Sequence, residues 1–516
     1  MRVEDFLEHS ARRAPHKTAL VCQGSRLTYG ELDRLSDRLA DSLTAHGVQR
    51  GDRVVIFLDN SVEAVVAVFA VLKAGAVFVM TNSSMKAEKL AYIANNSEAV
   101  GLISHARLEP VFAGIEHCSP ALRVIITAGS NRQAAIDNRV TALSWDEALL
   151  PGGLHRGNPG IDIDLATIIY TSGSTGFPKG VMMTHLNMVT AASSITQYLE
   201  NVPDDVILNV LPLSFDYGLY QILMGLKIGG TVVLEKSFAY PQQILDLLRD
   251  EKVTGLPIVP TMAAILLQIK ALTPGQFPSL RYITNTAATL PPAHISQLQR
   301  LFPSARIFSM YGLTECKRAA YLPPDQLGVR PASVGKAIPN TEVYIVDGQG
   351  EKVGPGVIGE LVIRGAHVMK GYWKRPEETD WALRPGPLPG EKVLFTGDLF
   401  KTDAEGYLYF VGRKDDAIKS RGEKVSPTEI ENVLYGIPDV LEAAVVGVPD
   451  EILGQAIKAV IVLRDGSSLT ENEILLHCRS HLEDFMVPQS VELTRTLPKT
   501  DTGKIRRRGL SIESNR

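Results

Sequence analysis

The sequence is poor in cysteine and has no long apolar run. Its four cysteines (Cys22, Cys118, Cys316 and Cys478) are scattered without a C-x-x-C pair, so they support neither a disulfide framework nor a zinc site. No apolar run reaches the roughly 18 residues of a membrane span. The N-terminus, MRVEDFLEHSARRAPHK, is charged from its second residue and lacks the apolar segment of a signal peptide. These absences predict a cytoplasmic protein with reduced thiols and no membrane span.

The sequence also lacks an excess of charge. It contains 53 Lys and Arg against 57 Asp and Glu, a net charge of −4, which gives no reason to expect a nucleic acid or an anionic membrane as partner. A hydrophobic fraction of 45% and a charged fraction of 21% are ordinary for a globular protein. At 516 residues the chain exceeds the size at which one hydrophobic core stops growing, so we expect two or more domains.

Strand and helix patterns alternate over most of the chain. The apolar spacing predicts strands at 53–58, 77–80 and 99–104, with helices between them at 62–74 and 87–95. Strand, helix and strand in this order favour a parallel sheet with helices on its faces.

Beyond Val334 the pattern changes to short strands between Gly/Pro turns, which predicts a largely antiparallel β region. The last stretch is long enough for a small α+β domain. We therefore predict two domains, at 1–414 and 415–516.

Residues 168–185 (IIYTSGSTGFPKGVMMTH) carry the strongest chemical signal. A hydrophobic run is followed by a segment rich in glycine and hydroxyl residues. There backbone N–H groups can converge on an anion, and Lys179 adds positive charge. The loop predicts a phosphate site, although its spacing is not that of a Walker A loop and a flexible surface loop is the alternative. The candidate anion-binding residues are Thr171, Ser172, Gly173, Ser174, Thr175, Gly176 and Lys179.

The segment 310–315 (MYGLTE) combines an aromatic ring, a glycine, a hydroxyl and a carboxylate. Tyr311 can stack a base, Gly312 allows a nucleotide to pass closely, and Glu315 can hold Mg²⁺ beside phosphates, because that ion needs oxygen ligands. An ordinary turn is the alternative.

Three later residues are weaker signals when taken alone. Asp398 follows a glycine at a strand end and can accept both hydroxyls of a ribose, or be an ordinary turn aspartate. Arg413 lies at the predicted domain boundary and is a candidate site residue. The alternative is that it belongs to a solvated, charged linker. Lys504 stands between Gly503 and Ile505 in LPKTDTGKIR. These neighbours predict a shaped loop instead of a disordered tail.

Taken together, the motifs YTSGSTGFPKG, YGLTE, TGDLF, GRKDDAIKSRGEKV and PKTDTGKIRR closely resemble the AMP-forming adenylating superfamily. This superfamily includes acyl-CoA synthetases, the adenylation domains of nonribosomal peptide synthetases and beetle luciferase. The likeness runs from LTYGELDRLSDRLA at Leu27 to the loop of Lys504, with GELVIRGAHVMKGYW at Gly359 in the family order. It implies an α/β fold: a large N-terminal domain of stacked, mostly parallel sheets plus a β-barrel-like subdomain, then a small mobile α+β C-terminal domain.

The resemblance also implies a two-step reaction with ATP and Mg²⁺ as cofactors. A carboxylate attacks the α-phosphate of ATP, pyrophosphate leaves, and a thiol then displaces AMP from the acyl-AMP. Since the first step joins two anions, positive charge and fixed donors are needed where phosphate charge develops. By resemblance Lys504, Thr175 and Glu315 are catalytic, with Lys504 bridging carboxylate and α-phosphate and with Thr175 and Glu315 holding Mg²⁺.

Further roles follow from the same resemblance. Asp398 takes the ribose hydroxyls, Arg413 supports it, and Asp415 is the hinge about which the C-terminal domain rotates to present the loop 419–423 to the thiol. The other implied nucleotide-binding residues are Asn285, Thr286, Ala287, Ala288, Met310, Tyr311, Gly312, Thr314 and Lys419.

The substrate is less determined by the sequence. Family acyl-CoA ligases typically carry PLFHxxG, but here the segment is PLSFDYG, with Phe215 in the histidine's place. Asp216 resembles the aspartate that pairs with the ammonium of an amino acid, although it could instead cap a helix. Lys317 and Arg318 stand where acyl-pocket residues occur, and a buried cation there needs Asp216 or a second substrate carboxylate as partner. The predicted pocket is Phe215, Asp216, Tyr220, Thr286, Met310 and Arg318.

Several functions therefore stay open. An acid–thiol ligase that uses coenzyme A comes first, followed by a free-standing amino-acid adenylation enzyme that loads the phosphopantetheine of a separate carrier protein. A luciferase-like oxygenase is a remote third. A nucleotide-binding regulator without turnover would be expected to have lost Lys504 or Glu315, and both are present.

Overall fold

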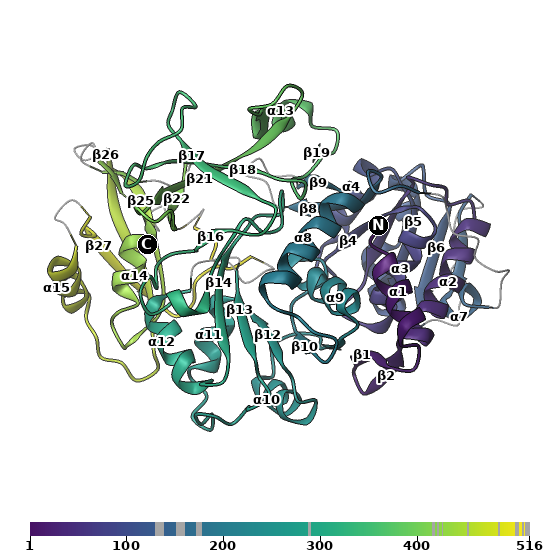
Figure 1. Ribbon diagram of the computed structural model, residues 1–516, viewed down its shortest axis with the longest axis horizontal. Helices are drawn as coiled ribbons and strands as arrows, with labels where there is room; N and C mark the ends of the chain where they lie inside the picture. Colours follow the sequence, from purple (N-terminus) through teal and green to yellow (C-terminus); the bar gives the residue numbers. More distant parts are fainter. Residues whose placement is uncertain are drawn as a thin grey trace.

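The computed structural model describes residues 1–129, 139–150, 160–171, 178–286, 290–414, 418–420, 423–425, 427–450, 454–482, 486–500, 505–507 and 510. Within these ranges the strands form four sheets, two of them large and mostly parallel. Figure 1 shows the purple N-terminal part at one end of the molecule, the teal part in the centre and the yellow C-terminal part at the other end.

The first large sheet contains β3 (Arg53–Phe57), β4 (Val77–Thr81), β5 (Ala99–His105), β6 (Val124–Ala128), β7 (Thr141–Ser144), β8 (Leu165–Thr171), β9 (Lys179–Thr184) and β19 (Gly371–Tyr372). Their order is β19-β9-β8-β4-β3-β5-β6-β7. The central pairs are parallel, and β4 is buried along its whole length, as expected for a strand covered on both faces. At one edge β8, β9 and β19 pair antiparallel.

The second large sheet contains β1 (Thr18–Cys22), β2 (Ser25–Thr28), β10 (Val206–Asn209), β11 (Thr231–Leu234), β12 (Gly255–Ile258), β13 (Tyr282–Asn285), β14 (Arg306–Tyr311), β15 (Ala320–Leu322) and β16 (Lys336–Ala337). Their order is β16-β15-β14-β13-β12-β10-β11-β1-β2. Because β12, β13 and β14 are parallel neighbours, their carboxyl ends at Ile258, Asn285 and Tyr311 meet at one edge of the sheet. Ligands of open α/β sheets bind at such an edge.

Helices pack against both large sheets, and at least one of them, α3 (Val62–Lys73), is buried in the core. Helix α3, VEAVVAVFAVLK, is apolar around its circumference and is buried from 64 to 73. One hydrophobic core joins α3 to strands of both large sheets, through residues such as Val54 and Val232. The helices of this part are α1 (Asp5–Arg13), α2 (Tyr29–Ala45), α3 (Val62–Lys73), α4 (Ala87–Asn96), α5 (Glu109–Phe112), α6 (Ile115–Cys118), α7 (Trp145–Ala148), α8 (His185–Tyr198), α9 (Asp216–Ile228), α10 (Pro241–Asp250), α11 (Pro260–Leu266) and α12 (Pro292–Leu301), with the 3-10 turns η1 (Ala106–Leu108) and η2 (Pro324–Gln326).

The region beyond Val334 is antiparallel, as the sequence predicts. It contains β17 (Glu342–Val346), β18 (Gly359–Arg364), β20 (Leu383–Pro385), β21 (Lys392–Thr402), β22 (Leu408–Arg413) and α13 (Pro376–Ala382). The strands pair in the order β17-β18-β21-β20, with β22 beside β21, and no strand pairing among the described residues closes them into the barrel that the resemblance implies.

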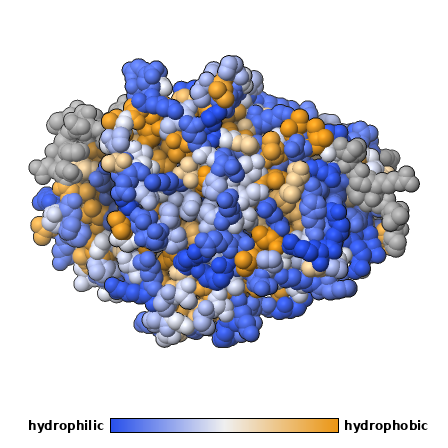
Figure 2. All heavy atoms as spheres, in the orientation of Figure 1, coloured by the Kyte–Doolittle hydropathy of each residue, from blue (hydrophilic) through white to orange (hydrophobic). Residues whose placement is uncertain are grey.

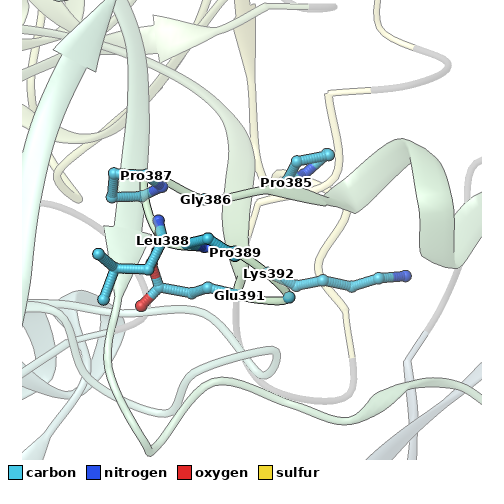
Figure 3. Close-up of a pocket in the computed structure, with 8 residues that line it drawn as sticks. Pro385, Gly386, Pro387, Leu388, Pro389, Glu391 and Lys392 are labelled. Atoms are coloured by element: carbon cyan, nitrogen blue, oxygen red, sulfur yellow. Dashed lines mark hydrogen bonds between the residues drawn. The ribbon is translucent and has the colours of Figure 1, made fainter.

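The turn between β20 and β21 encloses a surface hollow, which Figure 3 shows in close-up. Its charged residues already have partners: Glu391 Oε1 accepts a hydrogen bond from Arg364 Nε at 2.6 Å, and Lys392 Nζ donates to Asp380 Oδ1 at 3.0 Å. Since the hollow is lined by consecutive residues of one turn and contains no predicted site residue, we do not assign a function to it.

The C-terminal part has a sheet and a core of its own. It contains β23 (Ile418–Ser420), β24 (Glu423–Val425), β25 (Val440–Asp450), β26 (Gly454–Leu463), β27 (Ser490–Thr494), α14 (Pro427–Leu434) and α15 (Glu471–His481). A separate hydrophobic cluster joins these elements through residues such as Ile430 and Ile461. This part meets α12, where the rings of His294 and Tyr435 lie 5.6 Å apart. The boundary at 415 stays a prediction, because 415–417 lie outside the described residues.

The patterns of the sequence predict most of these elements, with two exceptions worth explaining. The sequence pattern also predicts a helix over 261–271, but α11 ends at Leu266, because the following residues close shorter turns, such as Ile269 N to Leu266 O at 3.2 Å. Strand β9 is not predicted, since it begins inside the glycine-rich segment.

The face of the molecule in Figure 2 is largely hydrophilic, with apolar residues scattered over it. No helix within the described ranges is long and apolar enough to cross a membrane. The cytoplasmic location stays a prediction.

Candidate active site

Two paired strands, β8 and β9, flank the predicted phosphate loop in the sequence. Strands β8 and β9 place Thr171 opposite Lys179 and Tyr170 opposite Gly180. Gly180 packs so closely that an added Cβ would lie 2.6 Å from the side chain of Ile168, so a larger residue would push the hairpin apart. The loop itself, 172–177, lies outside the described residues, and the phosphate-binding role of Ser172, Gly173, Ser174, Thr175 and Gly176 stays a prediction.

The carboxylate of Glu315 lies at the base of this loop, against Tyr372. Tyr372 Oη donates a hydrogen bond to Glu315 Oε1 at 2.7 Å, and Lys179 Nζ lies 5.5 Å from the centroid of the same ring. The backbone reinforces this contact, because Met369 N donates to the carbonyl oxygen of Glu315 at 2.7 Å. The structure therefore brings together Lys179 and Glu315, which the sequence separates widely.

Tyr372 is the site residue that sequence reasoning missed. It lies in the segment GYW, which helped to identify the resemblance but suggested no role. Its strand, β19, pairs with β9 opposite Val181, and this long-range pairing is what brings the ring to the loop. Burial, and then the charge of Glu315, raise the pKa of the Tyr372 phenol well above its ordinary value, so the hydroxyl stays protonated and donates to Glu315.

A second group of predicted residues meets where β14 ends. Tyr311 Oη donates to Asp398 Oδ2 at 2.6 Å, and Arg413 Nε lies 3.5 Å from Asp398 Oδ1. Asp398 and Arg413 are direct partners in the β21–β22 ladder, and the Tyr311 ring packs edge-on against Phe400 at 4.8 Å. A carboxylate offers about four lone-pair directions, so Asp398 can accept further hydroxyls beside that of Tyr311.

The predicted adenine-flanking residues lie beside this group. Asn285 ends β13 opposite Ser309 of β14, and Thr286 follows it; both side chains are buried. Met310 Sδ accepts a hydrogen bond from Tyr198 Oη at 2.9 Å. The turn after Tyr311 requires a glycine, because a Cβ on Gly312 would lie 2.3 Å from the carbonyl oxygen of Lys317. Thr314 is in the same turn, whereas Ala287 and Ala288 lie outside the described residues.

An ion pair is buried in the predicted acyl pocket. Lys317 Nζ lies 3.4 Å from Asp216 Oδ2, and their side chains are only 2% and 9% exposed. The ammonium also lies 4.6 Å from the ring centroid of Tyr220 and 5.4 Å from that of Tyr217. Burial, opposed by the charge of Asp216, lowers the pKa of Lys317 to about 7.

This pair corrects the helix-cap alternative for Asp216. The N-cap of α9 is Phe215, and no side-chain hydrogen bond caps the helix. Asp216 is instead the first helical residue, with its carboxylate turned to Lys317. Phe215 is half-buried, and its ring meets Tyr217 edge-on at 6.1 Å.

Arg318 is fully buried beside the pair. Its Cζ lies 5.3 Å from the ring centroid of Tyr217, and 1% of the residue is exposed. Its Nε and Nη1 have no hydrogen-bond acceptor within the described part of the chain. This arrangement is uncommon, since buried donors in proteins are nearly always paired.

The remaining predicted residues belong to the C-terminal part. Asp415 and Lys504 lie outside the described residues, and Lys419 is described only as backbone in β23. Their roles as hinge, catalytic lysine and thiol-presenting loop stay predictions.

The chain resembles known proteins over nearly its whole length. A family described as AMP-binding enzyme matches residues 7–373, and one described as AMP-binding enzyme C-terminal domain matches residues 429–504. A feruloyl-CoA synthase of an Amycolatopsis species is 36% identical over 498 residues, which cover 96% of this chain and 95% of that protein.

Two further comparisons bear on the fold and the acceptor. The crystal structure of the anthranilate CoA ligase AuaEII in complex with anthranoyl-AMP matches with a TM-score of 0.90 and 28% identity, over 99% of this chain and 96% of that one. A linear gramicidin synthase protein of Brevibacillus parabrevis is 28% identical over 99% of this chain, a match that covers 10% of that much longer protein. The TM-score, taken over 99% of this chain, shows that the anthranilate CoA ligase shares the fold described above.

Proposed function

This chain belongs to the family of AMP-binding enzymes, and from that premise we propose that it activates a carboxylic acid with ATP, releases pyrophosphate and transfers the acyl group to the thiol of coenzyme A. It is an AMP-forming acid–CoA ligase. The observation that carries this function is the meeting of Lys179 and Glu315 on Tyr372 at the base of the phosphate loop.

The first step joins two negatively charged reactants. A carboxylate oxygen attacks the α-phosphorus of ATP, a new oxygen–phosphorus bond forms, and the bond to pyrophosphate breaks without any proton transfer. Lys179 neutralises charge on the departing phosphates, while Asp398 accepts the ribose hydroxyls and fixes the nucleotide. In this proposal Lys504 bridges the two reacting anions.

The site residues fit a magnesium ion bound together with ATP. Mg²⁺ commonly binds through one or two carboxylates plus phosphates and waters, and Glu315 offers one oriented carboxylate. Among the described residues there is no cluster of three or more His, Cys, Asp or Glu that could hold a metal alone. When bound, the ion would supply charge neutralisation at the phosphates, with Glu315 and Thr175 as its protein ligands.

In the second step the thiol gives up its proton to solvent, its sulfur attacks the acyl carbon, and AMP leaves with the bonding electrons. This step no longer needs a lysine between acid and phosphate. Rotation about Asp415 would withdraw Lys504 and bring the loop of Lys419 to the thiol, so that one site serves both reactions.

The ion pair of Asp216 favours an acid without an α-ammonium. An aspartate that pairs with a substrate ammonium must have a negative charge that no other cation already neutralises. Asp216 instead faces the ammonium of Lys317 at 3.4 Å. The similarity to linear gramicidin synthase keeps one second candidate, an enzyme that loads an acid onto the phosphopantetheine of a separate carrier protein.

The test is pyrophosphate release from ATP with aromatic, fatty, dicarboxylic and amino acids, followed by addition of coenzyme A or a phosphopantetheinylated carrier protein. We expect release with a non-amino acid and a thioester with coenzyme A. A thioester with the carrier protein alone would support the second candidate. Absence of pyrophosphate with every acid would refute acid activation.

A further inference from the structure

We propose that the acid bound by this enzyme carries a second anionic group, and that the guanidinium of Arg318 binds this distal group. The inference rests on the proposed function and specifies its substrate class as a dicarboxylic acid.

Arg318 carries its hydrogen-bond donors into the protein interior. It is the largest fully buried side chain in the described part of the protein. Its Nε and Nη1 lack any acceptor there, although a guanidinium presents five N–H groups and always carries its charge. The ring of Tyr217 at 5.3 Å compensates some of the charge but accepts no strong hydrogen bond. A buried cation without an anion is costly, so a bound anion would relieve the cost.

The charges around Arg318 do not balance. Lys317 and Asp216 form a buried pair, and Lys317, whose pKa is about 7, cancels the charge of Asp216 when it is protonated. No carboxylate within the described ranges forms an ion pair with Arg318, which leaves one positive charge over. The hydroxyl of Tyr198 lies within hydrogen-bond reach of Arg318 but cannot supply the missing negative charge, because burial raises its pKa to about 12 even with Arg318 beside it.

Arg318 lies beside Tyr217 in the predicted acyl pocket and close to the nucleotide end. It lies against Tyr217, whose hydroxyl donates to the carbonyl oxygen of Thr284 at 2.8 Å, near the carboxyl end of β13. A short turn also ties it to the nucleotide end, because Ala319 N donates to the carbonyl oxygen of Tyr311 at 2.9 Å. Arg318 therefore lies at the sheet edge where ligands bind, one turn away from the Tyr311–Asp398 contact.

A carboxylate matches this guanidinium in both charge and shape. Two parallel N–H groups of arginine can donate to the two oxygens of one carboxylate, which adds orientation to the charge pairing. One distal carboxylate brings the total charge of Lys317, Asp216 and Arg318 plus ligand to zero. A methyl ester in the same position keeps the size but loses the charge.

The test compares dicarboxylic acids of increasing length with their monomethyl esters, in the pyrophosphate-release assay with the full-length enzyme. We expect the best diacid to exceed its ester in kcat/KM by roughly ten- to a hundred-fold, the effect of losing a charged partner in a built site. Arg318→Met should bring this ratio close to one, and Arg318→Lys should retain part of it. The matched control is Arg306→Met, at an arginine paired on the surface with Glu200, which should leave the ratio unchanged.

Two results would overturn the inference. An ester that reacts as well as its diacid in the wild-type enzyme would exclude a distal anion, and this result does not depend on a variant that folds. A diacid preference that survives Arg318→Met would show that another residue binds the distal group. Either outcome comes with pyrophosphate release, whereas failure of the proposed function would give no release with any acid.

Discussion

The nucleotide end and the acyl end of the candidate site differ in how their charged side chains are paired and buried. At the nucleotide end, Asp398 accepts a hydrogen bond from Tyr311 and faces Arg413, whose side chain is 63% exposed. At the acyl end, Lys317 and Arg318 are buried, with only Asp216 to balance them within the described residues. The first arrangement suits a ligand that brings hydroxyls, and the second suits a ligand that brings negative charge. The sequence predicts residues at both ends, but the ion pair and the unbalanced buried charge at the acyl end appear only through the packing.

The largest expected effect lies at the nucleotide end. Lys504→Ala should lower formation of the acyl-AMP by roughly 10² to 10³, the usual scale for one preorganised charge. Because this charge acts on the phosphate, the loss should be the same for every acid, and transfer from supplied acyl-AMP to the thiol should survive. Rapid-quench assays of the two half-reactions measure this, with Lys499→Ala as control, since Lys499 is paired with Glu442. Equal losses in both half-reactions would contradict the assignment.

The next effect should appear as stability at the acyl end. Asp216→Asn leaves the buried Lys317 without its anion, so the free energy of unfolding should fall by about 3 kcal/mol, as when one partner of a buried pair is removed. Urea denaturation measures it. Asp216→Asn combined with Lys317→Met should recover much of the loss, because the double change removes the pair as a whole. If the double variant were no more stable than the single one, the pair would not be the cause.

A smaller effect tests whether Tyr372 positions Glu315. Tyr372→Phe keeps the ring beside Lys179 but removes the donor to Glu315, and a hydrogen bond to a charged group contributes about 1.5–3 kcal/mol. We expect roughly a ten-fold slower release of pyrophosphate and a requirement for more Mg²⁺, with KM for the acid unchanged. Tyr344→Phe, in the antiparallel sheet, is the control. An unaltered Mg²⁺ dependence would mean that Glu315 needs no such support.

The smallest effect lies outside both ends, where α12 meets the C-terminal part. Burial, with a lesser effect of Arg464, lowers the pKa of His294 to about 4. In the unfolded chain the imidazole has a pKa near 6.5, so acidification protonates the unfolded state first and stability falls as pH drops. Between pH 7 and 5 this contribution should amount to about 1–2 kcal/mol.

Unfolding curves of the wild type and His294→Gln at both pH values isolate this contribution. Other buried groups, such as His185, are present in both proteins and cancel in the difference. The variant should lose less stability on acidification than the wild type. Equal losses would show that His294 is not what makes this contact sensitive to pH.

The sequence predicts much of the fold because its patterns are local. Helix α3 follows from an apolar run between Ser61, which caps it, and the turn at Ala74, and the central parallel strands follow from short apolar segments. The antiparallel strands beyond Val334 follow in the same way from Gly/Pro turns. Strand β9 is hidden, because lysine and glycine at its start resemble a loop.

The residues of the candidate site also fall into two groups, those that a local motif identifies and those whose role depends on long-range packing. Tyr311, Asp398 and Arg413 are named by motifs, and the structure adds only their contacts. The role of Tyr372 depends on the pairing of β19 with β9, which no local pattern reveals. Asp216 has three conceivable partners in the sequence (a helix end, a substrate ammonium or Lys317), and only the packing of α9 against the turn after β14 selects the third.

One measurement tests the central claim most directly, namely the fate of α-labelled ATP in a single turnover with enzyme and acid before and after coenzyme A is added. We predict that pyrophosphate and enzyme-bound acyl-AMP form first. Labelled AMP should then be released together with acyl-CoA when the thiol is supplied. Appearance of ADP and phosphate, or of acyl-CoA without any adenylate, would contradict the account.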